Sequence, residues 1–176
     1  MKKKSEMGQV LNEAIVAMGI VTIGVVAVFG FVTRAISQGR YIADQAAAVN
    51  LAAEGVEVVK NILDANALRP PGSSWSNGLN PPSAAYYQLD YKSRTLTGLS
   101  VVPNYGGSYP YGLTSIGFQN GFYAYGIGTP SSFVRTVFVE NIPGGSQIRV
   151  TSRVDWRGRN QRLNNVSIAS DMFDWR

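Results

Sequence analysis

The first third of the chain carries two hydrophobic patterns in succession. Residues 14–33 are uncharged at all twenty positions, and residues 42–63 hold apolar side chains at steps of three and four. A helix over the first stretch is about 30 Å long, which matches the hydrocarbon core of a bilayer. The second pattern is that of an amphipathic helix. We therefore predict one helix with a transmembrane half over residues 9–33 and an amphipathic half over residues 34–66.

The predicted helix ends near Asn66, because the sequence Arg-Pro-Pro-Gly at residues 69–72 cannot continue it. Its second half has an apolar stripe that we expect to face the core of a globular domain. This stripe consists of Ile42, Ala46, Val49, Ala53, Val56, Val59 and Leu63. A break at residues 37–39, which include Gly39, would instead give two separate helices.

Alternation of apolar and polar residues in the C-terminal third predicts antiparallel strands. Residues 133–141 are rich in β-branched and aromatic side chains, and Pro-Gly-Gly at residues 143–145 follows as a turn. Apolar and polar side chains then alternate over residues 148–156 and 166–172. Such a meander has one apolar face that the helical stripe can cover. We therefore predict an α+β fold, with a long N-terminal helix packed on a C-terminal antiparallel sheet and a globular β-rich part over residues 67–176.

The sequence between the helix and the meander gives weaker patterns. Residues 70–82 are rich in proline, glycine and serine, which predicts a loop. Residues 103–130 are rich in glycine and tyrosine, and we expect mostly irregular structure there. Short strands are predicted at residues 86–91, 96–102 and 122–127.

The residue composition argues against an enzyme. The chain has 176 residues, without cysteine or histidine. This excludes disulfides, thiolate metal sites, cysteine nucleophiles and a histidine base, and with them a conventional catalytic triad. The acidic residues of the C-terminal part lack the spacing of metal ligands: Asp90, Glu140, Asp155, Asp171 and Asp174. We predict a structural protein without enzymatic activity, cofactor or metal, and rank a membrane-tethered enzyme below the alternatives that follow.

Positive charge at the N-terminus predicts the orientation of the apolar stretch. Three lysines at residues 2–4 precede it and outweigh Arg34 and Arg40, which follow it. By the positive-inside rule the short N-terminus stays in the cytoplasm and the rest is exported. A cleaved secretory signal peptide and an uncleaved signal anchor are the alternatives for this segment.

A glycine and a glutamate precede the apolar stretch at a defined spacing. Gly8 ends the basic segment, and Glu13 follows five residues later at the edge of the apolar stretch. A carboxylate in hydrocarbon costs about 3 kcal/mol on insertion scales, so Glu13 is a candidate for function, although a helix N-terminus also tolerates it. The segments KKKSEMG and QVLNEAIVAMGIVTIGVVAV, residues 2–8 and 9–28, together resemble the signal of type IV pilins and type II secretion pseudopilins.

The resemblance implies that the chain is a processed filament subunit. A prepilin peptidase would cut between Gly8 and Gln9, remove the leader of residues 1–8 and methylate the new amine of Gln9. Glu13 would pair with the amine of a neighbouring pilin or pseudopilin subunit during assembly. The subunit would sit in the plasma membrane as a single-pass protein and then move into an extracytoplasmic filament at the cell surface.

The resemblance continues into the amphipathic half of the helix. Residues 52–60, with the sequence AAEGVEVVK, are similar to the corresponding stretch of minor pilins of the PilV type and of minor pseudopilins. The resemblance thus implies a pilin-like fold and a minor structural subunit of a type IV pilus or pseudopilus. The alternative from another class is a membrane-anchored surface protein with an uncleaved anchor and a tyrosine-rich adhesive face.

A second basic region lies near the C-terminus. It contains Arg149, Arg153, Arg157, Arg159 and Arg162. Alternate arginines are expected on the solvated side of a strand, where they also discourage edge pairing. The other interpretation is an anionic partner such as DNA or an acidic neighbouring subunit, and binding to DNA would weaken steeply with salt.

Overall fold

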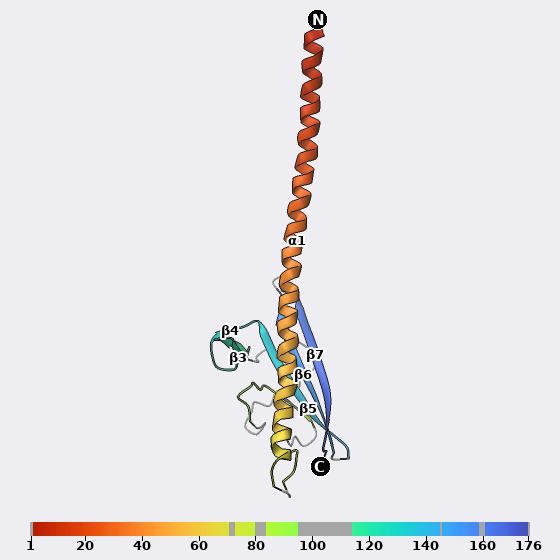
Figure 1. Cartoon of the computed structure of the whole chain (residues 1–176). Helices are drawn as coiled ribbons and strands as arrows, with labels where there is room; N and C mark the ends of the chain where they lie inside the picture. The colour runs from red at the N-terminus through yellow and green to blue at the C-terminus, as the bar shows by residue number, and fades with distance from the viewer. Residues whose placement is uncertain are drawn as a thin grey trace. The chain divides into compact units, whose positions relative to one another are not determined.

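The computed structural model of the chain describes residues 2–70, 73–79, 84–94, 114–144, 146–158 and 161–175, of which residues 2–8, 84 and 85 are described by their backbone alone (Figure 1). The chain divides into two compact units, Met1–Ala43 and Asp44–Arg176. The strand predicted at residues 96–102 lies outside the described residues. The same holds for Gly145 of the predicted turn and for residues 103–113 of the tyrosine-rich stretch.

A single helix, α1 (Lys2–Ala67), contributes residues to both units. The predicted continuous helix is confirmed, and no break occurs at residues 37–39. The predicted end near Asn66 is also confirmed. The buried side-chain amide of Asn66 donates hydrogen bonds to the carbonyl oxygens of Trp75, at 3.0 Å, and Asn77, at 2.6 Å. These bonds satisfy a buried polar group and hold the following loop against the end of α1.

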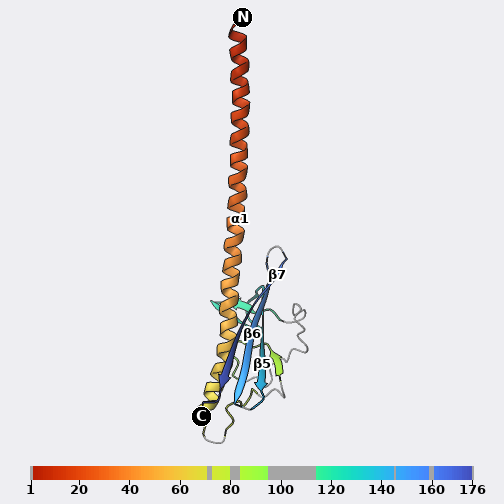
Figure 2. The ribbon, with the colours of Figure 1, turned by 90° about the vertical axis from the view of Figure 1, so that its right-hand side faces the viewer.

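The predicted meander forms the main sheet of the unit Asp44–Arg176 (Figure 2). Strands β5 (Phe133–Ile142), β6 (Gln147–Arg157) and β7 (Leu163–Phe173) pair antiparallel in sequence order. Strand β1 (Ala84–Tyr87) pairs antiparallel with β5 on the other side. With α1 these strands give the predicted α+β layout.

A second, smaller sheet occupies part of the stretch that we expected to be irregular. Its strands are β2 (Gly117–Gln119), β3 (Phe122–Ala124) and β4 (Thr129–Pro130), in the order β3-β2-β4. The prediction of a strand at residues 122–127 is thus confirmed for its first half, residues 122–124. Strands β2 and β4 were missed. Asn120 and Gly121 connect β2 and β3 with positive φ at both positions, the backbone of a type I′ hairpin turn.

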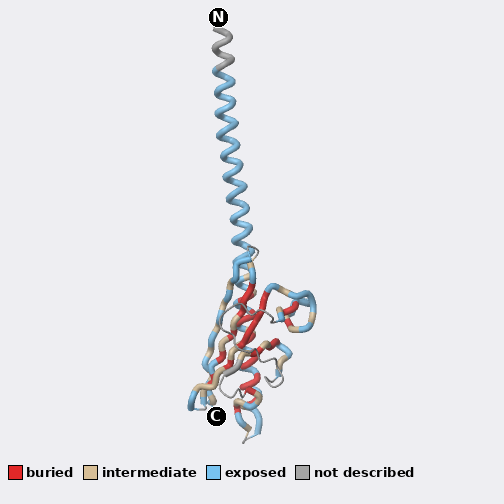
Figure 3. Tube along the Cα trace, turned by 180° about the vertical axis from the view of Figure 1, so that it is seen from behind, coloured by how far each residue is buried: buried red, intermediate tan, exposed pale blue. Residues whose placement is uncertain are grey.

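The helix covers the sheet with a different face from the one predicted. Figure 3 colours the buried residues of the chain red. Buried positions of α1 are Ala48, Leu51, Ala52, Gly55, Val58, Val59, Ile62, Leu63 and Asn66. Only Val59 and Leu63 of the predicted stripe are buried, and Val56 is half-buried. The other four residues of the stripe are exposed: Ile42, Ala46, Val49 and Ala53.

The close contact at Gly55 explains why a different face of α1 is buried. A Cβ atom placed on Gly55 would overlap the Oγ of Ser152 and would lie 3.1 Å from a methyl carbon of Val137. The helix can therefore approach β5 and β6 closely only on the face that carries Gly55. Periodicity alone could not find this face, because α1 has apolar residues on more than one side and close packing selects among them.

Substitution Gly55→Ala should destabilise the unit Asp44–Arg176 by about 1–3 kcal/mol, because the added methyl group overpacks this contact. The measurement is denaturant unfolding of the detergent-solubilised chain, followed by tryptophan fluorescence, since all three tryptophans lie in this unit. Gly39→Ala, with nothing within 4 Å, should cause no loss.

A second substitution tests the cause of this loss. The buried Oγ of Ser152 has no hydrogen-bond partner, so Ser152→Ala removes the overlapping atom without breaking a hydrogen bond. In that background Gly55→Ala should cost about 1 kcal/mol less. An unchanged cost would contradict the steric explanation.

Candidate functional site

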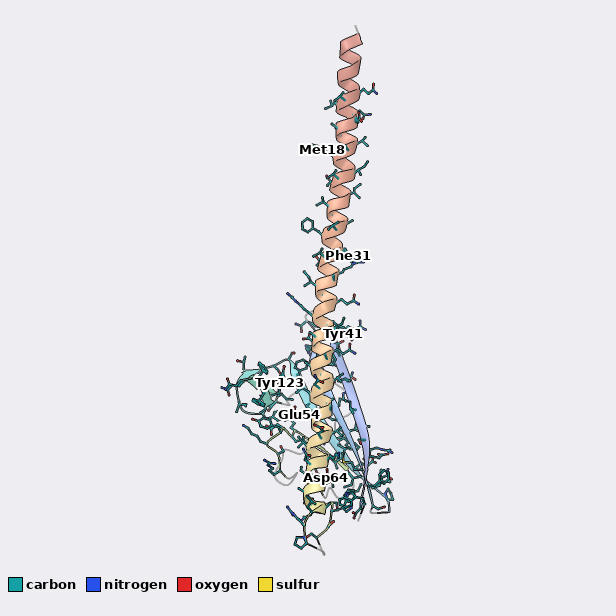
Figure 4. The ribbon with its side chains drawn as sticks, in the orientation of Figure 1. Met18, Phe31, Tyr41, Glu54, Asp64 and Tyr123 are labelled. Carbon is teal, nitrogen blue, oxygen red and sulfur yellow. The ribbon has the colours of Figure 1, made fainter. Side chains whose placement is uncertain are left out.

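The unit Met1–Ala43 is an apolar helix without a covering layer. Its side chains are exposed at every position from Gln9 to Ala43. Met18 and Phe31 point away from the helix and are each 74% exposed (Figure 4). By length and composition the helix can cross a membrane, with a mean hydropathy of 2.7 over 18 residues. A helix that is apolar on all sides over such a length is compatible with a membrane anchor.

The three predicted processing and assembly residues lie close together near the start of α1. Gly8 belongs to the segment for which only the backbone is described. Gln9 and Glu13 are exposed and four residues apart, hence on one face of the helix. Within the described part of the chain Glu13 has neither a hydrogen bond nor an ion pair. Glu13 thus lies exposed at the edge of the apolar segment, and its predicted role in assembly stays a prediction.

The C-terminal arginines do not form one surface. Arg149 of β6 donates to Asp171, the residue opposite on β7, through Nε at 2.7 Å and Nη2 at 3.0 Å. The hydrogen bonds from Arg149 lower the pKa of the Asp171 carboxyl group. The same hydrogen bonds raise the pKa of Arg149. Arg153 pairs at 2.7 Å with Asp155, which is fully buried. Two of the five positive charges are thus balanced within the sheet.

The remaining arginines mark one end of the main sheet. Arg157 and Arg162 are exposed on either side of the turn between β6 and β7, and Arg159 lies outside the described residues. The arrangement favours a solvated strand face for Arg149, whereas Arg153 is half-buried beside the buried Asp155. Fewer of the five arginines lie at the turn than the interpretation as a DNA-binding surface assumed.

Sequence reasoning missed a buried charge of the sheet, Arg135 of β5. It is fully buried, and Nη1 donates to the carbonyl oxygen of Leu51 at 2.9 Å. Nε and Nη2 donate to the carbonyl oxygen of Leu89 at 3.2 and 2.6 Å. The carboxylate of Glu54 lies 3.4 Å from Nη1. One side chain therefore links α1, β5 and the segment after β1.

A second set of polar contacts fixes the same segment. The hydroxyl of Tyr125 donates to the backbone carbonyl of Arg135 at 2.9 Å. Asp90 accepts hydrogen bonds from the backbone nitrogens of Lys92, at 3.0 Å, and Tyr125, at 3.1 Å. Burial raises the pKa of Tyr125 to about 12, and the positive charge of Arg135 opposes this rise only in part. These side chains bond to the backbone, so the network holds the fold together.

Within the described ranges, no three histidine, cysteine, aspartate or glutamate side chains are grouped to hold a metal ion. Comparisons of the chain with protein-family models, curated proteins and solved structures gave no match. A functional assignment therefore depends on the apolar helix, the residues at its start and the surface of the sheet-bearing unit.

Substitution Arg135→Met should destabilise the unit Asp44–Arg176 by about 3–5 kcal/mol, because two buried carbonyl oxygens and Glu54 lose their partner. Tryptophan fluorescence during denaturant unfolding measures the loss. Arg69→Met is the matched control at an exposed position of the same unit, where we expect a change within about 0.5 kcal/mol. Similar losses in both variants would refute the role of Arg135.

The raised pKa of Tyr125 predicts a loss of stability in alkali. An unfolded tyrosine ionises near pH 10, whereas folded Tyr125 keeps its proton until about pH 12. Between these values the unfolded state binds fewer protons, so the free energy of unfolding falls as pH rises, by about 2–3 kcal/mol in total. Unfolding curves measured across this range should show a shallower decline in Tyr125→Phe. Tyr87, whose pKa is also raised by burial, leaves a residual slope.

Proposed function

We propose that the chain is a structural, non-enzymatic subunit, of the minor class, in a type IV pilus or type II secretion pseudopilus. The observation that carries the proposal is the joint placement of Gly8, Gln9 and Glu13 directly before an uncovered apolar helix. A simple membrane anchor needs only the apolar helix. It does not require a glycine at the end of the basic segment or a carboxylate five residues later.

The apolar helix suits both stages of such a life cycle. In a bilayer its side chains face lipid tails, and in a filament they face the apolar helices of neighbouring copies. Transfer from the bilayer to the filament would therefore keep the apolar surface of this helix in apolar surroundings. Gly19, Gly24 and Gly30 have no atom within 4 Å of an added Cβ, and small residues of this kind let helices pack closely.

Cleavage after Gly8 changes the chemistry at the start of the helix. Before cleavage the nitrogen of Gln9 is a neutral peptide amide, and afterwards it is a cationic amine. An unpaired charge in surroundings of low polarity costs several kcal/mol, and a partner of opposite charge removes much of this cost. The carboxylate of Glu13 and the amine of Gln9 in the next copy would meet only in the correct register. The pair would therefore select register and restrict assembly to cleaved subunits.

The first test is the chemical state of the N-terminus. Mass spectrometry of the protein from cells with a prepilin peptidase should find a chain that begins with N-methylated Gln9. Gly8→Leu should leave residues 1–8 attached, whereas Ser5→Ala, a change within the leader, should be processed normally. An intact leader on the wild-type chain would instead favour the uncleaved, membrane-anchored adhesive protein.

The second test concerns assembly. Glu13→Gln keeps the shape of the side chain and removes its charge, so incorporation into sheared filaments should fall by more than about tenfold, since the neighbouring amine is left unpaired. Asn12→Ala is the control at the adjacent position and should assemble normally. Quantitative immunoblots of filament and membrane fractions measure the ratio. Equal incorporation of both variants would remove Glu13 from the mechanism.

A further inference from the structure

Strand β7 forms an open edge of the main sheet (Figure 2). Among the described strands it pairs with β6 alone, in an unbroken register from Leu163 to Phe173. Proteins protect such edges with lysine, proline or bulges, because free backbone groups can pair with another chain. Strand β7 contains no lysine, arginine or proline, and its one acidic residue, Asp171, is paired with Arg149 of β6. The edge is therefore regular and unprotected over its whole length.

The side of β7 that faces α1 is incompletely covered. Its inward residues Val166, Ile168 and Met172 pack against the two core clusters but are only half-buried. The inward residues of the neighbouring β6 are all buried: Ile148, Val150, Ser152, Val154 and Trp156. Position explains the difference, because β6 has a strand on both sides and β7 has one on a single side. A further strand beside β7 would complete the burial of its three apolar side chains.

Hydrogen bonds at both ends of the β6–β7 ladder show which backbone groups of β7 are free. Gly158 donates to the carbonyl of Arg162, at 3.0 Å, and Asp174 donates to the carbonyl of Ser146, at 2.9 Å. Hydrogen-bonded pairs alternate with other pairs in an antiparallel ladder. Counted from either bond, the even-numbered residues of β7 bond to β6, and the N–H and C=O groups of the odd-numbered residues point to the open edge. These odd-numbered residues also have exposed side chains: Leu163, Asn165, Ser167, Ala169, Asp171 and Phe173.

Two antiparallel copies of β7 match each other when both are centred on Ile168. Leu163 of one copy then lies opposite Phe173 of the other, and these apolar side chains, 39% and 60% exposed, cover each other. Asp171 meets the neutral side chain of Asn165, so no like charges face each other. Odd-numbered residues lie opposite odd-numbered residues throughout. The free groups of both strands therefore form about twelve backbone hydrogen bonds, close to the number in a typical interface.

We propose that β7 binds the β7 strand of a second copy of this chain and that the two copies form a symmetric dimer with one continuous sheet. Main-chain hydrogen bonds supply the affinity, and the side chains of the two strands set the register. Both copies use the same surface, so association closes at two. The two strands run antiparallel, whereas subunits of one filament run parallel. The contact thus joins copies of different filaments or copies outside a filament, and it does not depend on the function proposed above.

Distances between nitroxide labels measure this register in the full-length, detergent-solubilised chain, which has no cysteine of its own. Each sample carries one cysteine, at Leu163, Asn165, Ser167 or Ala169. Pairing about Ile168 places the two Cα atoms of residue 167, or of residue 169, about 8 Å apart. The corresponding distance is about 21 Å at residue 165 and about 34 Å at residue 163. Electron paramagnetic resonance should recover this series, and equal distances at all four positions would overturn the proposal.

Substitution Ser167→Pro tests whether the open edge makes the contact. The N–H group of residue 167 points away from β6, so proline removes a donor from the edge without breaking the ladder to β6. Sedimentation equilibrium of the full chain in detergent should show a dimer, and its dissociation constant should rise more than about tenfold in this variant, since hydrogen bonds beside the symmetry axis are lost. Ser167→Ala is the matched control and should dimerise like the wild type. Tryptophan fluorescence during denaturant unfolding verifies that each variant is folded.

Substitution Ser167→Lys provides a second test, which holds even if the proline variant does not fold. It keeps the backbone donor and places two ammonium groups beside the symmetry axis. Their repulsion should weaken the dimer, more strongly at low salt than at high salt. A wild-type chain that stays monomeric at all concentrations overturns the proposal. Equal dissociation constants in the wild type and the variants also overturn it, since another surface, such as the apolar helix of the unit Met1–Ala43, then makes the contact.

Discussion

Burial of the Arg135 guanidinium constrains the whole sheet-bearing unit. A buried charge without partners costs several kcal/mol, and here the partners come from α1 and from the segment after β1 at the same time. Apolar clusters lie on both sides of this point along α1, one around Trp156 and one around Ile148. Apolar packing alone tolerates small rotations and slips of a helix over a sheet. The directional bonds of Arg135 allow only one arrangement.

The elements with strong periodicity could be predicted from the sequence. The apolar stretch and the Pro-Pro pair after Asn66 define the course and the end of α1, and strict alternation defines β6 and β7. Shorter elements need other signals. The Asn-Gly pair at residues 120–121 is a hairpin signal that our prediction did not use. The buried face of α1 could not be predicted, because Gly55 counts as neutral in a periodicity argument although it decides how closely the helix packs.

The residues of the candidate site also differ in how far the sequence could predict them. Gly8, Gln9 and Glu13 are visible in sequence because their meaning depends on spacing along one helix, and their roles remain predictions. The arginine cluster was only partly understood, since Asp171 balances Arg149 from the neighbouring strand, 22 residues away, whereas Asp155 balances Arg153 from two positions along the same strand. Arg135 could have been noticed as a charge at an inward position between Phe133 and Val137. Its partners could not, because they lie 46 and 84 residues away.

The bonds of Arg135 also determine which surface of α1 is left for other molecules. By holding Glu54 and Leu51 toward β5, they turn Ala46, Val49 and Ala53 to the outside. A charged or long polar residue would be the usual choice at such exposed helical positions, yet these three are apolar. Small apolar side chains on an exposed helix face suit close contact with another helix. The constraint that fixes the fold of the subunit thus also presents an apolar helix face that neighbouring copies in the proposed filament would cover.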